Sequence, residues 1–187
     1  DRLRLVTVHP ETNAAQPLAA LDAVLTALAA TPGPILITAP NADPGGAEAL
    51  HRIDAFVKRQ DGAVFHQSLG SDLYPNALRH ASVMVGNSSS GIIEAGLFGL
   101  PVINVGGRQD GRLREDNVRD CPSDADTVME MLRDPLPRFA QQSPYGDGAA
   151  APRVADSITE SHDLERLLYK RFAADDAAFV APWQADA

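Results

Sequence analysis

The chain has 187 residues, 44% of them apolar, which is enough to bury one full hydrophobic core. Aromatic residues make up only 5%, while Ala, Val, Ile and Leu dominate, a balance that favours helices packed on a sheet over a β-sandwich. The formal net charge of −9, without a Lys-rich or Arg-rich stripe, argues against nucleic acid and anionic membrane surfaces as partners.

The cysteine content and the lengths of the apolar runs predict a cytoplasmic location. Cys121 is the single cysteine, and the apolar runs are far shorter than the ~20 residues of a membrane-spanning helix. The chain opens at Asp1 rather than at Met and leads directly into the strand-like residues 3–8. We therefore expect it to be one part of a longer protein, separated at an interdomain linker.

The first predicted strand, residues 5–8, ends at His9 and Pro10. In an open parallel sheet that end of a strand faces the ligand crevice. A histidine there could protonate or hydrogen-bond a leaving phosphate, because its ordinary pKa lies near neutrality. The alternative is a histidine that is merely solvated or satisfied within the core.

The next segments alternate between the two kinds of element. Residues 17–30 place leucines at helical spacings, and residues 35–38 form a short strand followed by a turn that contains Asn41. Asn41 should therefore point to the same edge as His9, although a turn by itself needs no function. Further helices are predicted at 47–58 and 73–81, with a strand at 63–65 between them. This alternation predicts an α/β fold with a doubly wound, Rossmann-like parallel sheet.

The most informative segment joins the predicted strand 83–85 to a helix through small and hydroxylated residues. Ser88, Ser89 and Ser90 supply hydroxyl donors at the helix start, and Gly91 would let a phosphate approach the backbone. This pattern is typical of a pyrophosphate site. The alternative is that the serines only cap the helix and that Glu94 only complements its dipole.

Glu94 lies one turn into the predicted helix, where a carboxylate could accept hydrogen bonds from the two hydroxyls of a ribose. The first strand is not followed by G-x-G-x-x-G, which argues against NAD or FAD. We therefore expect a nucleoside diphosphate attached to another group, with no cofactor and no metal.

After the predicted strand 102–105 comes a Gly-rich loop that holds Arg108 and Arg112. Two guanidiniums near an anion suit bidentate phosphate contacts, although the loop could also be an ordinary solvated surface loop. Residues 106–121 are expected to be a long irregular connector, followed by helices at 124–133 and 151–172. We assign residues 1–172 to one nucleotide-binding domain and residues 173–187 to a C-terminal tail.

Together these segments resemble the C-terminal domain of UDP-N-acetylglucosamine 2-epimerases of the hydrolysing type. The non-hydrolysing type reads closer to T-D-S-G-G at the phosphate loop, where this chain has Asn-Ser-Ser-Ser-Gly. Gly107 and Asp110 depart from the residues usual in the family. The segments that carry the resemblance are His9-Pro10, Pro40-Asn41, residues 86–94, 98–104 and 106–112, Asn117-Val118 and residues 145–148.

The resemblance implies one half of a glycosyltransferase-B-like fold, with UDP or UDP-GlcNAc bound against a missing N-terminal domain. By resemblance, Ser88 and Ser89 hold the β-phosphate, Glu94 the ribose, and Asn41 and Arg108 the nucleotide end of the cleft. His9 would assist the departure of UDP. The implied reaction eliminates UDP to give a 2-acetamidoglucal and then hydrates it to N-acetylmannosamine, for sialic acid and related sugars. The full-length protein is expected to form a homo-oligomer, and this half alone is expected to be inactive.

Other functions fit the same motifs. A glycosyltransferase of the same fold would share the phosphate loop and the ribose contact but would require an acceptor. A second class is a regulatory module that senses a nucleotide sugar without turnover. Related 2-epimerases that act on diacetylated bacillosamine nucleotides share the motifs as well, so the sequence specifies the nucleotide more closely than the sugar.

Overall fold

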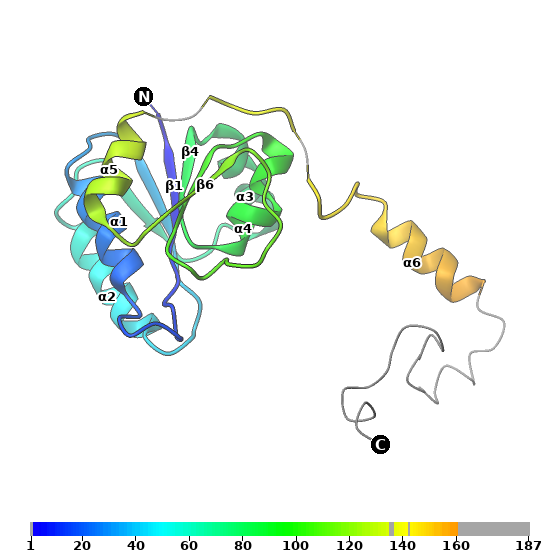
Figure 1. Ribbon diagram of the computed structural model, residues 1–187, viewed down its shortest axis with the longest axis horizontal. Helices are drawn as coiled ribbons and strands as arrows, with labels where there is room; N and C mark the ends of the chain where they lie inside the picture. The colour runs from blue at the N-terminus through cyan, green and yellow to red at the C-terminus, as the bar shows by residue number, and fades with distance from the viewer. Residues whose placement is uncertain (1, 135–136, 142, 161–187) are drawn as a thin grey trace, which may run out of the picture. The chain divides into compact units, whose positions relative to one another are not determined.

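The computed structural model describes residues 2–134, 137–141 and 143–160, and it contains a six-stranded sheet in which every pairing is parallel. The strand order is β3-β2-β1-β4-β5-β6 (Figure 1). Chain order therefore reverses direction between β1 and β4, and this is the point where sheets of this kind form a ligand crevice. The strands are β1 Arg4–Thr7, β2 Ile35–Thr38, β3 Ala63–His66, β4 Val83–Gly86, β5 Val102–Val105 and β6 Val118–Cys121.

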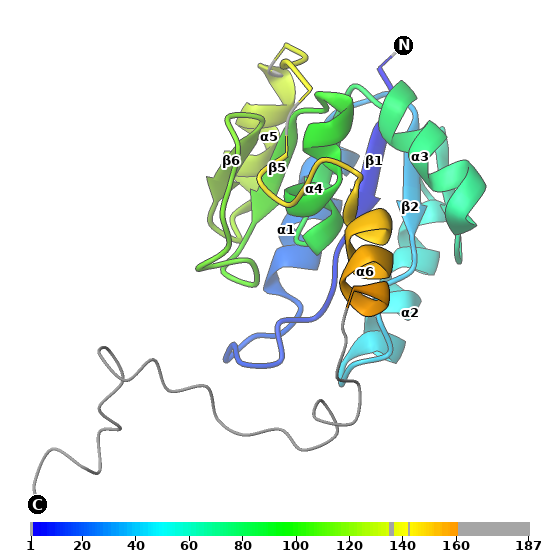
Figure 2. The same cartoon turned by 90° about the vertical axis from the view of Figure 1, so that its right-hand side faces the viewer.

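Helices cover both faces of the sheet. Helices α1, α2 and α5 lie on one side, and α3, α4 and the short 3-10 helix η1 lie on the other (Figures 1 and 2). The three central strands β1, β4 and β5 are buried at every position, as expected for parallel strands covered on both faces. The helices are α1 Ala19–Ala29, α2 Gly46–Val57, α3 Gly70–His80, α4 Ser89–Ile93, η1 Ala95–Phe98, α5 Ala125–Arg133 and α6 Ala150–Thr159.

Alternate residues of the central strands feed two hydrophobic clusters. Val6 and Val85 face α1, α2 and α5, whereas Leu5 and Met84 face α3 and η1. The predicted α/β class, the parallel sheet and the five predicted strands are confirmed, with strand ends that differ by at most one residue.

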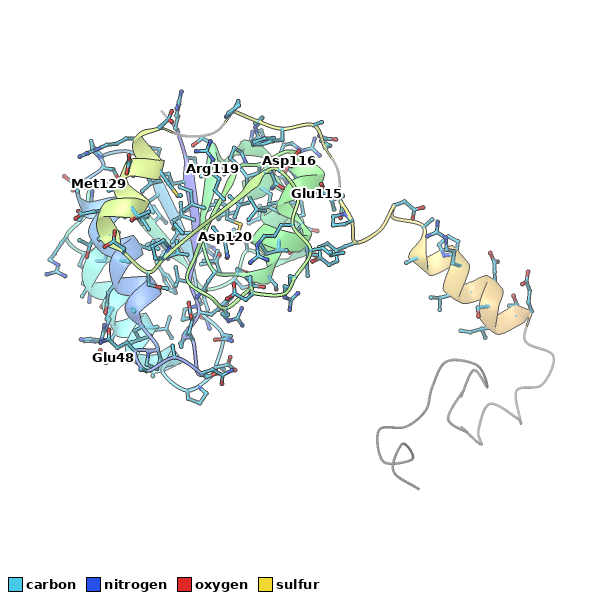
Figure 3. The ribbon with its side chains drawn as sticks, in the orientation of Figure 1. Glu48, Glu115, Asp116, Arg119, Asp120 and Met129 are labelled. Carbon is cyan, nitrogen blue, oxygen red and sulfur yellow. The ribbon has the colours of Figure 1, made fainter. Side chains whose placement is uncertain are left out.

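The predicted irregular connector at 106–121 was wrong in its last part, because β6 pairs with β5 along the sheet edge. Its middle residues Arg119 and Asp120, labelled in Figure 3, are exposed and charged, so the strand lacks the apolar alternation that identifies a strand in sequence. Asp120 accepts a 2.6 Å hydrogen bond from Asn104 of β5 and forms a 2.8 Å ion pair with Arg114. These polar contacts fix a strand that buries little apolar surface.

The described part of the chain divides into two compact units at Tyr145 and Gly146, and α6 belongs to the second. The prediction of a helix over 151–172 is tested only as far as Thr159, where α6 ends; the tail at 173–187 lies outside the described residues. Among the described helices, none has both the length and the apolar character needed to cross a membrane.

Candidate nucleotide-binding site

A cleft of about 620 Å³ opens at the carboxyl ends of the strands on both sides of the β1/β4 switch point. It brings together His9, Glu94 and the three predicted serines, which are far apart in the sequence. The cleft is lined by Thr7, His9, Thr38, Ala39, residues 67–71, Tyr74, Pro75, Ser88, Ser89, Ser90 and Glu94.

The predicted phosphate loop begins at Gly86, the last residue of β4, where only glycine fits. Its φ is +140°, and a Cβ atom there would lie 2.0 Å from the carbonyl oxygen of Thr7. Ser88 caps α4, since its Oγ accepts the N–H of Ser90 at 3.3 Å. The cleft side of this turn presents the serine hydroxyls, while the N–H of Ser90 donates to Ser88 Oγ and that of Gly91 donates to Ser88 O.

The predicted helix after this loop is short. Helix α4 has only five residues and gives way to η1 at Glu94, which is exposed at the junction. So short a helix carries little macrodipole, and any anion bound here would depend on individual donors. Glu94 still lines the cleft, so its carboxylate remains available to a ribose.

Gly91, predicted to let a phosphate approach the backbone, packs closely against the sheet. A Cβ atom at Gly91 would meet Val102 Cγ1 at 2.9 Å and Met84 Sδ at 3.6 Å, so its missing side chain points into the sheet. Gly91 is not among the residues that line the cleft. It permits close packing of α4 on β4 and β5, which is the role of a helix–strand contact glycine.

His9 is held as a neutral imidazole of defined tautomer. Its Nδ1 accepts the backbone N–H of Asn41 at 2.9 Å, so the proton resides on Nε2. Burial and the nearby positive charge of Arg108 lower the pKa of His9 to about 4, and the charge of Asp43 acts weakly in the opposite direction. Of the two predicted actions of His9, hydrogen bonding by Nε2–H is therefore favoured over protonation by an imidazolium.

Asn87 is a residue whose role the sequence reasoning missed. It is fully buried; its Oδ1 accepts the N–H of His9 at 2.7 Å, and its Nδ2 donates to the carbonyl oxygen of His9 at 2.9 Å. Its own carbonyl oxygen accepts Gln109 Nε2 at 2.7 Å and Arg108 Nη1 at 3.3 Å. One side chain and one carbonyl thus tie together the loops that follow β1, β4 and β5.

The other predicted ligands take different places. Asn41 contacts His9, and Arg108 contacts Asn87. Neither is among the residues lining the cleft. Arg112 is exposed, and in the described part of the chain no contact links its guanidinium to the cleft, so its role as a phosphate ligand stays a prediction. Arg112 stands three residues beyond the buried Gln109, where the loop has already turned outward.

A second hollow, of about 550 Å³, lies at the opposite, amino-terminal edge of the sheet beside Arg4. The guanidinium of Arg4 already donates to Thr31 O, Thr31 Oγ1 and Gly33 O at 2.6 to 2.8 Å. Thr31 follows Ala30, the C-cap of α1, at a helix end where a cation is favoured by the helix dipole. The arginine therefore caps a helix end, and the carboxyl-edge cleft is the better ligand site.

An open parallel sheet with a polar cleft at its switch point defines a Rossmann-like α/β domain of the ligand-binding kind. The chain belongs to the UDP-N-acetylglucosamine 2-epimerase family, whose model matches residues 1–159.

Individual relatives agree with this family. A Legionella pneumophila protein named UDP-N,N'-diacetylbacillosamine 2-epimerase (hydrolyzing) is 37% identical over 134 residues, 71% of this chain and 35% of the relative. A Campylobacter jejuni GDP/UDP-N,N'-diacetylbacillosamine 2-epimerase (hydrolyzing) is also 37% identical over 134 residues, which cover 70% of this chain and 35% of that protein. The chain thus spans about a third of the length of these relatives.

The fold has solved counterparts. The UDP-GlcNAc 2-epimerase of Neisseria meningitidis, solved bound to UDP-GlcNAc, matches with a TM-score of 0.65 at 14% identity. The match covers 86% of this chain and 45% of that structure. The glycosyltransferase-B-like, Rossmann-like half predicted from the sequence is confirmed as the fold.

Proposed function

We propose that this chain is the UDP-binding half of a hydrolysing UDP-N-acetylglucosamine 2-epimerase, which converts UDP-GlcNAc to N-acetylmannosamine and UDP. The observation that carries the proposal is the convergence of His9, Ser88 and Glu94 from two strand ends on one cleft. Donors for a diphosphate and an acceptor for a ribose then lie at the edge where such sheets bind nucleotides.

In this proposal Ser88 and Ser89 hold the β-phosphate with their hydroxyls and backbone N–H groups. Glu94 accepts the ribose hydroxyls from the rim of the cleft. Arg108 contributes positive charge from behind, at the carbonyl oxygen of Asn87, rather than as a direct ligand of the cleft wall.

The proposed reaction has two steps. In the first, C2 of the sugar loses a proton while the bond from C1 to the UDP oxygen breaks, which gives the glucal. In the second, water adds its hydroxyl to C1 and a proton to C2, on the face of C2 opposite to the one that lost its proton. Nε2–H of His9 donates a hydrogen bond to the departing diphosphate and stabilises its developing charge.

The groups that remove the C2 proton and handle the water are assigned to the remainder of the parent protein, which this chain does not span. Catalysis needs all these groups in register around one transition state. We therefore expect the isolated chain to bind UDP but not to turn over substrate. Calorimetry of the 187-residue chain with UDP tests the binding half of the proposal; no binding at millimolar UDP would remove it.

The hydrolysing type is supported by the Asn-Ser-Ser-Ser-Gly loop and by the names of both 37%-identical relatives. Those names also favour a second candidate substrate, the diacetylbacillosamine nucleotide. The full-length parent should be incubated with each nucleotide sugar alone and the products followed by NMR. Release of N-acetylmannosamine and UDP supports the first substrate, turnover of only the second supports the alternative, and two intact donors point to a glycosyltransferase or a sensor.

A further inference from the structure

Two hydrogen-bonded pairs of hydroxyl groups line the cleft, and the roles above use Ser90 alone among their members. The Oγ1 atoms of Thr38 and Thr7 are 2.6 Å apart, and Tyr74 Oη donates to Ser90 Oγ at 2.6 Å. These residues come from β2, β1, α3 and α4, and all of them line the cleft. Hydroxyl groups from four different elements thus meet at one cleft, and this convergence requires an explanation.

The Tyr74 hydroxyl is the donor in the second pair. Burial raises the pKa of the Tyr74 phenol, so the hydroxyl keeps its proton and donates it to Ser90 Oγ.

The direction of the last bond decides what Ser90 can do. Because Tyr74 donates its proton to Ser90 Oγ, the hydroxyl proton of Ser90 is not used in that bond. Ser90 is only 9% exposed, and its exposed part faces the cleft. A buried hydroxyl with a free proton is a directed donor for an oxygen anion.

We propose that Tyr74 is a positioning residue that aims the Ser90 hydroxyl at a phosphate oxygen of the bound nucleoside diphosphate. The inference rests on the proposed function, because it requires UDP in the cleft. It also revises the place of Ser90, which acts as one member of a pair rather than as a free serine like Ser88. A purely structural bond, which only fastens α3 to α4, would leave ligand selectivity unchanged.

The test compares Tyr74→Phe, Ser90→Ala and the double variant by calorimetry with UDP, UMP and uridine. Tyr74→Phe should lower UDP affinity about three- to tenfold, the size of one hydrogen bond, and leave uridine affinity unchanged. The double variant should bind UDP as weakly as Ser90→Ala alone, because the two side chains act as one unit. Tyr145→Phe is the matched control, since the Tyr145 hydroxyl donates to Leu113 O and not into the cleft.

Each other outcome overturns the inference. Wild-type UDP affinity in Tyr74→Phe, additive losses in the double variant, or an equal loss for uridine would each show that Tyr74 does not act through Ser90 on a phosphate. Failure of the unaltered chain to bind UDP would overturn the proposed function itself, so the two failures are distinguishable. Circular dichroism and thermal unfolding establish that the single variants, the double variant and the control are folded.

Discussion

The side chain of Asn87 brackets the backbone of His9, accepting its N–H at 2.7 Å and donating to its carbonyl oxygen at 2.9 Å. Asn87 thus pairs with His9 much as a neighbouring strand would, just beyond the point where β1 and β4 stop pairing as a sheet. The position of the imidazole is therefore set by the loop proposed to hold the phosphate. The residues proposed to contact the phosphate and the leaving group therefore form one unit.

Asn87→Asp should break the hydrogen bond that joins the Asn87 side chain to the carbonyl oxygen of His9. The substitution keeps the shape but replaces the Nδ2 donor by an acceptor that faces the carbonyl oxygen of His9 and the Glu11 carboxylate. We expect a loss of about 2–4 kcal/mol in the free energy of unfolding, measured in urea, and weaker UDP binding. The matched control is Asn76→Asp, an exposed amide on α3. Equal unfolding free energies for the two variants would contradict the bracketing role.

His9 should make stability depend on pH. Its pKa is about 4 in the folded chain against an ordinary 6.5, so the unfolded chain binds a proton in this range that the folded chain does not. The contribution of neutral His9 to the free energy of unfolding is complete above about pH 6.5. It is lost as the pH falls toward 4, by at most about 3 kcal/mol.

In His9→Gln the free energy of unfolding should therefore fall less steeply between pH 6.5 and 5 than in the unaltered chain. The matched control is His51→Gln, a substitution at an exposed histidine of α2. Parallel curves for His9→Gln and the unaltered chain would show that His9 titrates normally in the folded state.

The role of Glu94 can be measured by changing the sugar of the nucleotide. If its carboxylate accepts the ribose hydroxyls, the chain should prefer UDP to 2'-deoxy-UDP by about tenfold, and Glu94→Ala should abolish that preference. Titration calorimetry with both nucleotides measures it, with the exposed Glu130→Ala of α5 as the control. A preference that survives in Glu94→Ala assigns the ribose contact elsewhere.

Gly91→Ala should destabilise the fold by overpacking. The new methyl group would lie 2.9 Å from Val102 Cγ1, which predicts a loss of about 1–3 kcal/mol in thermal unfolding. Shortening the neighbour in the double variant with Val102→Ala should recover part of that loss, measured against Val102→Ala alone. If Gly91 instead served phosphate approach, Gly91→Ala would lower UDP affinity and leave stability unchanged.

The sequence predicted the elements that have a strong periodic pattern. The five strands rich in Val and Ile and the helices between them follow from local spacing, and for the central strands burial on both faces demands apolar runs. Strand β6 carries Arg119 and Asp120 in its middle, so no local pattern marked it; pairing with β5 and the contacts of Asp120 formed it. The rule that open parallel sheets bind ligands at the carboxyl ends of their strands likewise predicted that His9 and the serines would lie at one cleft.

What the sequence alone determined is the class of sheet, its ligand-binding edge and the residue types gathered there, since these depend on periods of two and 3.6 residues and on where strands end. Only the tertiary structure decided how those residues are used. Gly91 packs on Val102, Tyr74 pairs with Ser90, and Asn87 holds His9, each across a separation in sequence that local pattern does not encode. Such pairings arise because buried polar groups must find partners in three dimensions and close-packed side chains leave no spare volume.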